Sequence, residues 1–460
     1  MKRYTIAEIA EIAGGKVLYG DPEYLVSGYA IDSREAVPGE VFFAIKGAAT
    51  DGHKFIHQVL EKGCNCLVVS DETKLPENVK TANVVLVDNA LFALQELGKD
   101  YLATLPIKKI IGVTGSVGKT STRDMMYYVA SSKYKAAKNK KNYNSSTGIP
   151  LSILEFPEDT EIAVLEMGMD APGEITELVG LAAPDIAIIT SITQVNLMGL
   201  GTVENIFKAK MEITGKFGKE NTLVVNTTFP MLSEERVKGE YALVTVGDGS
   251  SSNYYVSDIS DFGDEGINYI MHTKDKSYNI SLPVAGAHNA YNATLAIAVG
   301  ELIGITVEEA AGGLINAELT GKRLNVSEHN GIKIIDDSYN ACEISVKSAI
   351  NTLAATKGER KVAILGDILG LEEFSERAHR SIGKHACDKG VDLVIAIGGE
   401  ARFIADEARK YIGDERVMHY DKKEDFINQK DDILKSGDVI LLKASRIMEL
   451  EKISQAILEG

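Results

Sequence analysis

An α/β fold with three domains is predicted by three features of this sequence. Its 460 residues exceed what one hydrophobic core accommodates, so two or three domains are expected. Short apolar segments alternate with helical segments, as in the βαβ units that build mainly parallel sheets. The proportions of hydrophobic (45%) and charged (25%) residues are those of ordinary globular proteins. We place the domains at residues 1–84, 85–318 and 319–460.

Charge and hydropathy exclude several classes of protein. The net charge of −17 argues against a nucleic-acid-binding protein. The sequence has no run of 18 apolar residues, so we expect no stable membrane insertion. The N-terminal segment "MKRYTIAEIAEIAGGKV" lacks an apolar signal core, because Glu8 and Glu11 interrupt it. We interpret it as the start of a folded domain.

The cysteines predict no disulfide framework and no metal site. Neither a CxxC pair nor a metal-ligand spacing occurs among Cys64, Cys66, Cys342 and Cys387. Free thiols of this kind are typical of the reducing cytosol. We therefore expect a cytoplasmic protein, and we expect it to be a monomer.

The first domain reads as a small α/β domain. The segments "EVFFAIKG" and "CLVVSD" predict strands, and "HKFIHQVLEKG" predicts an amphipathic helix that ends at a glycine cap. The segment "NALFALQELGKDYLATLP" then predicts a connecting helix that Pro106 stops.

The central domain is predicted to contain a mainly parallel sheet. Its apolar strand segments are "KKIIGVTG", "EIAVLEMG", "IAIITSI" and "NTLVVN", and "KTSTRDMMYYVASS" predicts a helix after the first of them. Residues 241–283 contain short, alternating, turn-separated segments, which predict an antiparallel patch at the side of the domain. The segment "NATLAIAVGELIGI" predicts a strongly apolar helix.

The last domain is predicted to be doubly wound and Rossmann-like. Four buried-strand segments, "KIIDDS", "KVAILGD", "VDLVIAIGG" and "DVILLKAS", are separated by helical segments. The glycine pair in "AIGGEARF" is a weak nucleotide signal, and we interpret it as an ordinary strand-to-helix turn.

The segment "IIGVTGSVGKTSTRDMM" predicts a phosphate-binding loop in the central domain. Its spacing departs from G-x-x-x-x-G-K-[ST], because five residues separate Gly112 from Gly118 and two separate Gly115 from Gly118. A strand precedes the loop and a helix follows it, which is the context of a P-loop. Lys119 would contact the terminal phosphates, and Thr120 would place a hydroxyl on Mg²⁺. The alternative is a glycine turn next to a surface lysine.

Charged residues at strand and helix ends are further candidates. Glu166 follows an apolar strand, where a carboxylate can complete a magnesium shell or simply be solvated. Lys208 and Lys210 lie two apart and point to different faces of a helix, and composition alone assigns both to the surface.

Polar residues near the second domain boundary leave alternatives open. Asn289 and Asn292 lie three apart at a helix start, where amides either cap the helix or contact a nucleobase. Arg323 is a candidate phosphate ligand. Asp336 and Asp337 follow a strand, which suggests ribose or metal contact, or a plain turn.

These motifs, in this order, resemble the Mur ligase family over essentially the whole chain. The family's loop TG-x-x-GK-[ST] matches Thr114–Thr120. Further similarity lies in "IDSREAVPGEVFFAIKGAATDGHKFI", "NYNSSTGIPLSIL", "LEMGMDAPGEI", "PDIAIITSI", "AHNAYNATLAIAV", "DDSYNA" and "LLKASRIMEL". The "DNPR" sequence of the diaminopimelate-adding members is missing.

The resemblance implies an ATP-dependent ligase of cytoplasmic peptidoglycan precursor synthesis. It would join D-alanyl-D-alanine to UDP-N-acetylmuramoyl-tripeptide through an acyl phosphate. The first domain would bind the UDP substrate, the central P-loop domain would bind ATP, and the C-terminal domain would bind the dipeptide.

The resemblance also implies a role for individual residues. The catalytic residues would be Lys119, Glu166 and Lys210. ATP would be bound by Thr114, Gly115, Ser116, Val117, Gly118, Lys119, Thr120, Ser121, Asn292, Arg323 and Asp337. Two Mg²⁺ sites are implied, with ligands among Thr120, Glu166, carbamylated Lys210 and Asn196. The UDP moiety would lie near Ser33 and Arg34. The muramoyl-peptide channel would be lined by Asn142, Asn144 and Thr147. The dipeptide would face Tyr339, Asn340, Lys443, Ser445 and the rest of the Lys443–Arg446 segment.

Three departures from the family pattern bear on function. Asn196 stands where the family usually has a histidine near the second magnesium, although an amide oxygen can still bind Mg²⁺. Cys342-Glu343 replaces a usual Asn-Pro, and Gly370 replaces a usual Glu. One alternative is therefore a related ligase with a different amine or depsipeptide acceptor. Another is a non-catalytic nucleotide-binding relative, against which the intact Lys119, Thr120, Glu166 and Lys210 argue.

Overall fold

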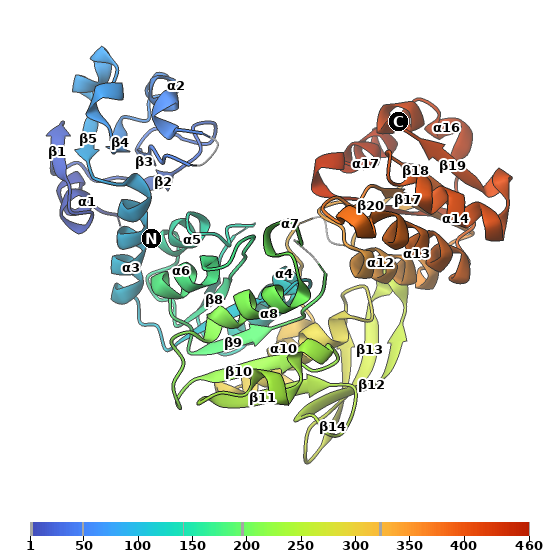
Figure 1. The fold of residues 1–460 in the computed structure, drawn as a ribbon. Coiled ribbons are helices and arrows are strands. Elements are labelled where there is room, and N and C mark those ends of the chain that lie inside the picture. The colour runs from blue at the N-terminus through green and yellow to red at the C-terminus, as the bar shows by residue number, and fades with distance from the viewer. Residues whose placement is uncertain (1–2, 48–49, 141, 195–196, 322–323, 460) are drawn as a thin grey trace. The chain divides into compact units, whose positions relative to one another are not determined.

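The computed structural model describes residues 3–47, 50–140, 142–194, 197–321 and 324–459 (Figure 1). Within these ranges the strands form three sheets, of five, nine and six strands. The predicted α/β class with three domains is confirmed, and the boundaries after residues 84 and 318 stay predictions. The chain packs as two compact units. One comprises Met1–Thr114, Tyr134–Ala187 and Met211–Asn221, and the other Gly115–Lys133, Ile188–Lys210 and Thr222–Gly460.

The five-stranded sheet forms the core of the N-terminal domain, with the order β1-β5-β4-β3-β2. β1 is antiparallel to β5, and the other pairs are parallel. Its strands are β1 (Lys16–Tyr19), β2 (Gly28–Ala30), β3 (Glu40–Phe43), β4 (Cys66–Val69) and β5 (Asn83–Leu86). The helices are α1 (Ile6–Ile12), α2 (Ile56–Glu61) and the connecting α3 (Ala90–Thr104). α3 begins where the Asn89 side chain accepts from the N–H groups of Leu91 and Phe92, and it ends just before Pro106, as predicted.

The nine-stranded sheet has the order β14-β13-β12-β11-β10-β9-β6-β8-β7. Its strands are β6 (Lys109–Thr114), β7 (Ala136–Lys138), β8 (Ile162–Glu166), β9 (Ile186–Ile189), β10 (Thr222–Asn226), β11 (Ala242–Gly247), β12 (Tyr254–Asp261), β13 (Ile267–His272) and β14 (Ser277–Leu282). The helices are α4 (Lys119–Ser131), α5 (Gly148–Leu154), α6 (Glu174–Leu181), α7 (Leu197–Leu200), α8 (Val203–Met211), α9 (Glu234–Val237), α10 (Asn289–Leu302) and α11 (Val307–Leu314). The predicted apolar helix is α10, which is buried along most of its length.

The antiparallel patch predicted for residues 241–283 is wrong for its first segment. β11 is parallel to both β10 and β12, whereas β13 is antiparallel to both β12 and β14. An alternating pattern reports that one face of a strand is exposed and does not fix the direction of the strand. The chain between β10 and β11 contains α9, and this crossover sets the parallel direction.

The six-stranded sheet has the order β15-β16-β20-β17-β18-β19, with β15 antiparallel and the other strands parallel. Its strands are β15 (Asn325–His329), β16 (Ile332–Asp336), β17 (Arg360–Gly366), β18 (Leu393–Ile397), β19 (Val417–Tyr420) and β20 (Asp438–Lys443). The helices are α12 (Glu343–Ala355), α13 (Ser375–Asp388), α14 (Arg402–Ile412), α15 (Lys423–Ile427), α16 (Lys430–Ile433) and α17 (Glu451–Leu458). One core packs under α12, α13 and α14, and a second under α15 and α17, so the predicted doubly wound fold is confirmed.

The parts of the chain that the structure describes contain no helix long and apolar enough to cross a membrane.

The turn after β18 is an ordinary strand-to-helix turn, as predicted. Gly398 has φ +113° there, and the N–H of Ala401 donates to Asp367 Oδ1 at 2.7 Å.

Candidate active site

A large cavity within the second unit brings many of the predicted residues together. Its volume is about 460 Å³. It is lined by the loop at the start of α4, the first turn of α10, and the segments that follow β16, β17 and β20. The predicted site residues in its wall are Ser116, Val117, Gly118, Lys119, Thr120, Ser121, Asn292, Asp337, Tyr339, Asn340 and Lys443.

The loop between β6 and α4 has a backbone that requires glycine at two positions. Gly115 has φ +148°, and a Cβ atom there would lie 2.0 Å from Thr190 Oγ1. Gly118 has φ +84° and is the N-cap of α4. The first turn of α4 therefore starts at Lys119 with its N–H groups at the loop, an arrangement that suits anions.

Two residues after β9 hold this loop, and the sequence analysis did not single them out. The N–H of Ser116 donates to Ser191 O at 2.9 Å, and the N–H of Val117 donates to Ser191 Oγ at 2.8 Å. Thr190 Oγ1 in turn donates to Val117 O at 2.5 Å. The sequence signal for Thr190 and Ser191 was a pair of polar residues directly after the buried strand β9. This strand neighbours β6, which leads into the loop.

Lys119 lies along its own loop. Its ammonium donates to Gly115 O at 2.9 Å and to Ser116 O at 3.3 Å. Thr120 and Ser121 are buried in the first turn of the helix, and Thr114 is buried at the end of β6. Lys119 therefore lines the cavity as part of the loop, and the interpretation as a surface lysine is wrong.

Asn289 and Asn292 do not cap α10. The N-cap residue His288 makes no side-chain cap bond. Asn289 Nδ2 donates backwards to Ala285 O at 2.7 Å, and Asn292 Nδ2 donates to Asn289 Oδ1 at 2.9 Å. Asn292 Oδ1 lies 3.0 Å from the position of a Cβ on Gly118, so this amide packs against the loop.

Glu166 ends β8 in a buried position within the first unit. It is paired in register with Val113 of β6, and its residue exposure is 2%. Asn144 Nδ2 donates to Glu166 Oε1 at 2.8 Å. The interpretation as a solvated glutamate is therefore wrong. Asn142 and Thr147 lie in the same loop as Asn144, where Thr147 Oγ1 is 3.1 Å from Ser145 Oγ.

Lys208 and Lys210 occupy opposite environments on α8. Lys208 is exposed, whereas Lys210 has an exposure of 3%. The expected difference in face is confirmed, and the assignment of both lysines to the surface is wrong for Lys210. Composition could not show this, because burial depends on what packs against the helix.

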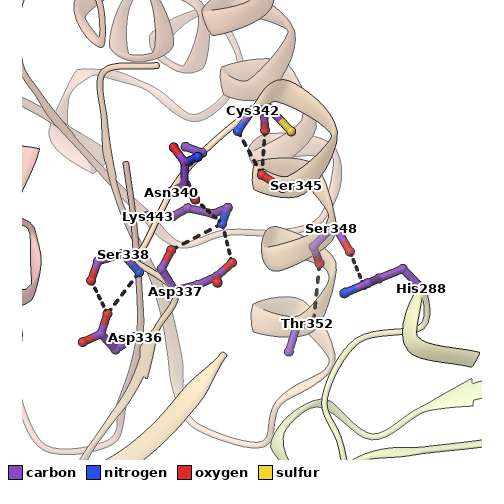
Figure 2. Close-up of polar contacts among 11 residues, drawn as sticks. His288, Asp336, Asp337, Ser338, Asn340, Cys342, Ser345, Ser348, Thr352 and Lys443 are labelled. Carbon is purple, nitrogen blue, oxygen red and sulfur yellow. Dashed lines mark hydrogen bonds and ion pairs between the residues drawn. The ribbon is translucent and has the colours of Figure 1, made fainter. Parts of the chain in front are cut away.

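The two aspartates after β16 have different partners (Figure 2). Asp336 Oδ1 accepts from the N–H of Ser338 at 3.1 Å and from its hydroxyl at 2.5 Å, so the turn interpretation is confirmed for Asp336. Asp337 Oδ2 accepts from Lys443 Nζ at 2.5 Å, and Lys443 also donates to Asn340 O at 2.9 Å. Lys443 is 3% exposed, so this is a buried ion pair in the cavity wall. Ser445 lies beyond it, where its hydroxyl accepts from the N–H of Leu369.

His288 is a cavity residue that the sequence analysis missed. Its Nδ1 lies 2.7 Å from Ser348 Oγ of α12, and Figure 2 shows the ring directed at that hydroxyl. His288 is exposed as a residue, and its ring lies in the wall of the cavity. Partial desolvation by this wall, followed by the charge of nearby Lys443, lowers the pKa of His288 to about 4.

The departures at the C-terminal domain affect the cavity unequally. Cys342 and Gly370 line it. Cys342 precedes α12, where its N–H donates to Ser345 Oγ at 2.9 Å. Glu343 is not in the wall, and its carboxylate pairs with Lys347 at 2.7 Å.

The remaining predicted residues belong to the N-terminal domain or lie outside the described residues. Ser33 is buried in the N-terminal domain and donates to Gln58 Oε1 at 3.1 Å. Arg34 is bound to Asp32, and Lys62 donates to the carbonyl groups of both Ser33 and Arg34. Asn196 and Arg323 lie outside the described residues.

A buried strand, a glycine loop with Lys119, and a helix, set in a parallel sheet, define a P-loop α/β protein. Three family models match the chain: the Mur ligase family catalytic domain at residues 25–102, the Mur ligase middle domain at 113–300, and the Mur ligase glutamate ligase domain at 322–446. The chain belongs to the Mur ligase family.

Particular relatives are similar over the whole chain. The UDP-N-acetylmuramoyl-tripeptide–D-alanyl-D-alanine ligase of Bacillus subtilis (strain 168) is 37% identical, covering 100% of this chain and 99% of that protein. A crystal structure of MurF from Acinetobacter baumannii is 26% identical with a TM-score of 0.85, covering 100% of both chains. The MurF ligase of Thermotoga maritima in complex with ADP is 27% identical with a TM-score of 0.79, covering 94% of this chain and 97% of that one.

Proposed function

We propose that the chain is an ATP-dependent ligase that joins D-alanyl-D-alanine to UDP-N-acetylmuramoyl-tripeptide, as a monomer in the cytoplasm. The observation that carries the proposal is the cavity in which the P-loop faces Asn292, Asp337 and Lys443. The similarity to the ligase of Bacillus subtilis over the full chain supports the choice of substrates. We also propose that residues 1–84, 85–318 and 319–460 bind the UDP substrate, ATP and the dipeptide, respectively.

The loop fits a nucleoside triphosphate. Gly115 and Gly118 have the positive φ angles that a glycine-rich phosphate loop uses, and a Cβ at Gly115 would collide with Thr190. Lys119 would leave its loop carbonyls to bind the terminal phosphates. The proposed ATP ligands are Thr114, Gly115, Ser116, Val117, Gly118, Lys119, Thr120, Ser121, Asn292, Arg323 and Asp337. The ADP complex of the Thermotoga maritima relative supports nucleotide binding.

The residues implied as magnesium ligands carry oxygen donors of the kind that Mg²⁺ prefers. Within the described ranges, no cluster of three or more His, Cys, Asp or Glu side chains could hold a metal. Mg²⁺ in phosphate sites needs few protein ligands, since phosphates and water complete its shell. We propose Thr120, Glu166, carbamylated Lys210 and Asn196 as ligands of two ions. When bound, Mg²⁺ would offset repulsion between the triphosphate and the substrate carboxylate.

The reaction would proceed through an acyl phosphate. The tripeptide carboxylate attacks the γ-phosphorus of ATP, and ADP leaves. The dipeptide amine then attacks the acyl carbon, and phosphate leaves from the tetrahedral intermediate. The chain mainly positions these groups and neutralises their charge, with Lys119 at the transferred phosphoryl group.

The substrate residues are assigned by domain. We propose that Ser33 and Arg34 bind the UDP moiety, and that Asn142, Asn144 and Thr147 line the muramoyl-peptide channel. The dipeptide would contact Tyr339, Asn340, Lys443 and Ser445. A different amine or depsipeptide acceptor is a second candidate, because Cys342 and Gly370 line the cavity.

One assay separates these functions. Purified protein is supplied with ATP, Mg²⁺, UDP-N-acetylmuramoyl-tripeptide and D-alanyl-D-alanine, and phosphate release is followed with each component omitted in turn. Release that needs both substrates supports the proposal. Release with another amine or with D-alanyl-D-lactate, and none with D-alanyl-D-alanine, supports the second candidate. ATP binding without turnover for any acceptor would identify a non-catalytic relative.

A further inference from the structure

The side chain of Asn139 binds both the backbone N–H and the backbone C=O of Glu166. Asn139 directly follows β7 and is fully buried. Its Oδ1 accepts from the N–H of Glu166 at 2.8 Å, and its Nδ2 donates to Glu166 O at 3.1 Å. The same Nδ2 donates to Tyr143 O at 2.8 Å. One side chain therefore makes three hydrogen bonds, two of them to Glu166.

These bonds continue the β7–β8 ladder after β7 has ended. The parallel register pairs Ala136 with Ile162 and Lys138 with Val164, so its continuation would place Asn139 opposite Leu165 and Lys140 opposite Glu166. In a parallel ladder, the N–H and the C=O of one residue bind two different residues of the neighbouring strand. A side-chain amide carries the same C=O and N–H groups as a peptide, so the Asn139 side chain alone binds both backbone groups of Glu166 where β7 has ended.

Because the Asn139 side chain makes these bonds, the backbone after Asn139 can leave the sheet. Residues after Asn139 form the loop that contains Asn144, whose side chain donates to Glu166 Oε1. The backbone of Asn144 is fixed as well, because its C=O accepts from the N–H of Gly168 at 2.9 Å. A Cβ on Gly168 would lie 2.8 Å from Asn144 Cγ, so glycine permits this close approach. Glu166 is therefore held at its backbone by Asn139 and at its carboxylate by Asn144.

We propose that Asn139 is a positioning residue for the ligase reaction. Its side chain binds the backbone of Glu166 where β7 has ended, and it thereby fixes the direction of the Glu166 carboxylate. The inference rests on the proposed function, in which Glu166 binds Mg²⁺. Residues that orient a metal ligand typically change metal affinity or activity by about 10–100-fold when they are replaced. Asn139 would act through Glu166 without touching substrate.

The test compares Asn139→Asp and Asn139→Ala with two reference variants. Asn139→Asp keeps the acceptor for the Glu166 N–H but loses both donated bonds. Glu166→Gln reports the role of Glu166 itself. Tyr101→Phe is the matched stability control, because Tyr101 Oη makes a buried bond to Phe156 O at 2.6 Å in the same unit, and Tyr101 does not contact Glu166 in any bond described above.

Two quantities are measured: the Mg²⁺ concentration for half-maximal activity, and the gain in ADP affinity that Mg²⁺ confers, by calorimetry. We expect both Asn139 variants to need at least about tenfold more Mg²⁺ and to lose most of that gain. Tyr101→Phe should lower the melting temperature and leave both quantities unchanged.

Each outcome decides something different. If Glu166→Gln changes the Mg²⁺ dependence and the Asn139 variants do not, the positioning role is wrong and the proposed function stands. If Glu166→Gln also leaves it unchanged, the magnesium role of Glu166 is wrong and the inference falls with it. Loss of the fold in both Asn139 variants, judged by circular dichroism, would make Asn139 a residue of general stability and contradict the proposal.

Discussion

At the scale of residues, two side chains of the same type can differ in burial because different elements pack against them. Lys208 and Lys210 are the same residue type two positions apart, yet one is exposed and the other is buried. A buried ammonium is costly to desolvate, and carbamylation would convert it into an anion that can bind Mg²⁺. The residue scale is therefore where the chemical state of Lys210 can be tested.

Lys210→Ala should lower activity by about 10²–10³-fold, the scale of a lost electrostatic contact in an active site. If the working form is a carbamate, added acetate or propionate should restore part of the rate, and methylamine should not. Steady-state phosphate release measures both effects. Lys208→Ala is the matched control and should keep full activity. Rescue by methylamine and not by carboxylates would show that the ammonium form is the active one.

His288 gives the structure a defined response to acid. Its folded pKa is about 4, below the usual value of 6.5 that the unfolded chain keeps. As the pH falls from about 6.5 towards 4, the unfolded chain takes up a proton that the folded chain does not, so wild-type stability falls. The melting temperature of His288→Gln should therefore fall less than that of the wild type between pH 7 and pH 5. Parallel curves would contradict this assignment.

Several site residues could be predicted from sequence, and others could not. Lys119 and Thr120, which line the cavity, were predictable because the chemistry of a P-loop fixes residue types near a strand end. Thr190, Ser191 and His288 were not, because they act through contacts with segments far away in the sequence. The burial of Lys210 and the pairing of Glu343 with Lys347 also depend on packing, which composition does not report.

At the scale of elements, the β6–loop–α4 unit determines where phosphates can bind. The loop is fixed by Ser191 on one side and by the start of α4 on the other. Strand directions and edge strands were the weak points of prediction. β15 and β19 have few buried residues, so they lack the apolar runs that identified their neighbours.

Gly115→Ala should disrupt this loop. The added Cβ would lie 2.0 Å from Thr190 Oγ1 and 3.1 Å from the Ser191 nitrogen, at a φ of +148°. Strain of about 1–3 kcal/mol should weaken ADP binding by roughly tenfold or more, measured by calorimetry. Gly180→Ala is the control, because it lies in α6 with no heavy atom within 4 Å of the new Cβ. It should bind ADP normally and be slightly more stable. Equal affinity in both variants would contradict the loop geometry.

The helix α4 carries a buried ion pair. Arg123 and Asp124 are both fully buried, with Arg123 Nη2 2.7 Å from Asp124 Oδ1. The other oxygen, Asp124 Oδ2, accepts from the N–H of Thr320 at 2.6 Å.

Arg123→Met should destabilise the protein by about 3–5 kcal/mol, since it leaves a buried carboxylate without this cation. The double variant Arg123→Met/Asp124→Asn should recover part of that loss, because no buried charge remains. Urea unfolding midpoints compare the variants. A double variant at least as unstable as the single one would contradict the role of the pair.

At the scale of the whole molecule, candidate site residues stand at the carboxyl ends of parallel strands in two of the sheets. Thr114 and Glu166 end strands of the nine-stranded sheet, and Lys443 ends a strand of the six-stranded sheet. Functional groups at strand ends are the rule in open α/β sheets, which explains why sequence alone indicated the fold class and much of the candidate site. The second-unit cavity joins the P-loop to Asp337 and Lys443, which is what a ligase needs to pass an activated carboxyl group to an amine.

The most direct test of this account follows an oxygen atom. UDP-N-acetylmuramoyl-tripeptide carrying ¹⁸O in its terminal carboxylate is incubated with the protein, ATP, Mg²⁺ and D-alanyl-D-alanine, and the released phosphate is examined by mass spectrometry. The carboxylate oxygen that attacks the γ-phosphorus stays with phosphorus when the amine displaces it. An acyl-phosphate route predicts ¹⁸O in the phosphate together with one amide-linked product per ADP. Phosphate free of ¹⁸O, or ADP formed without the amide product, would contradict it.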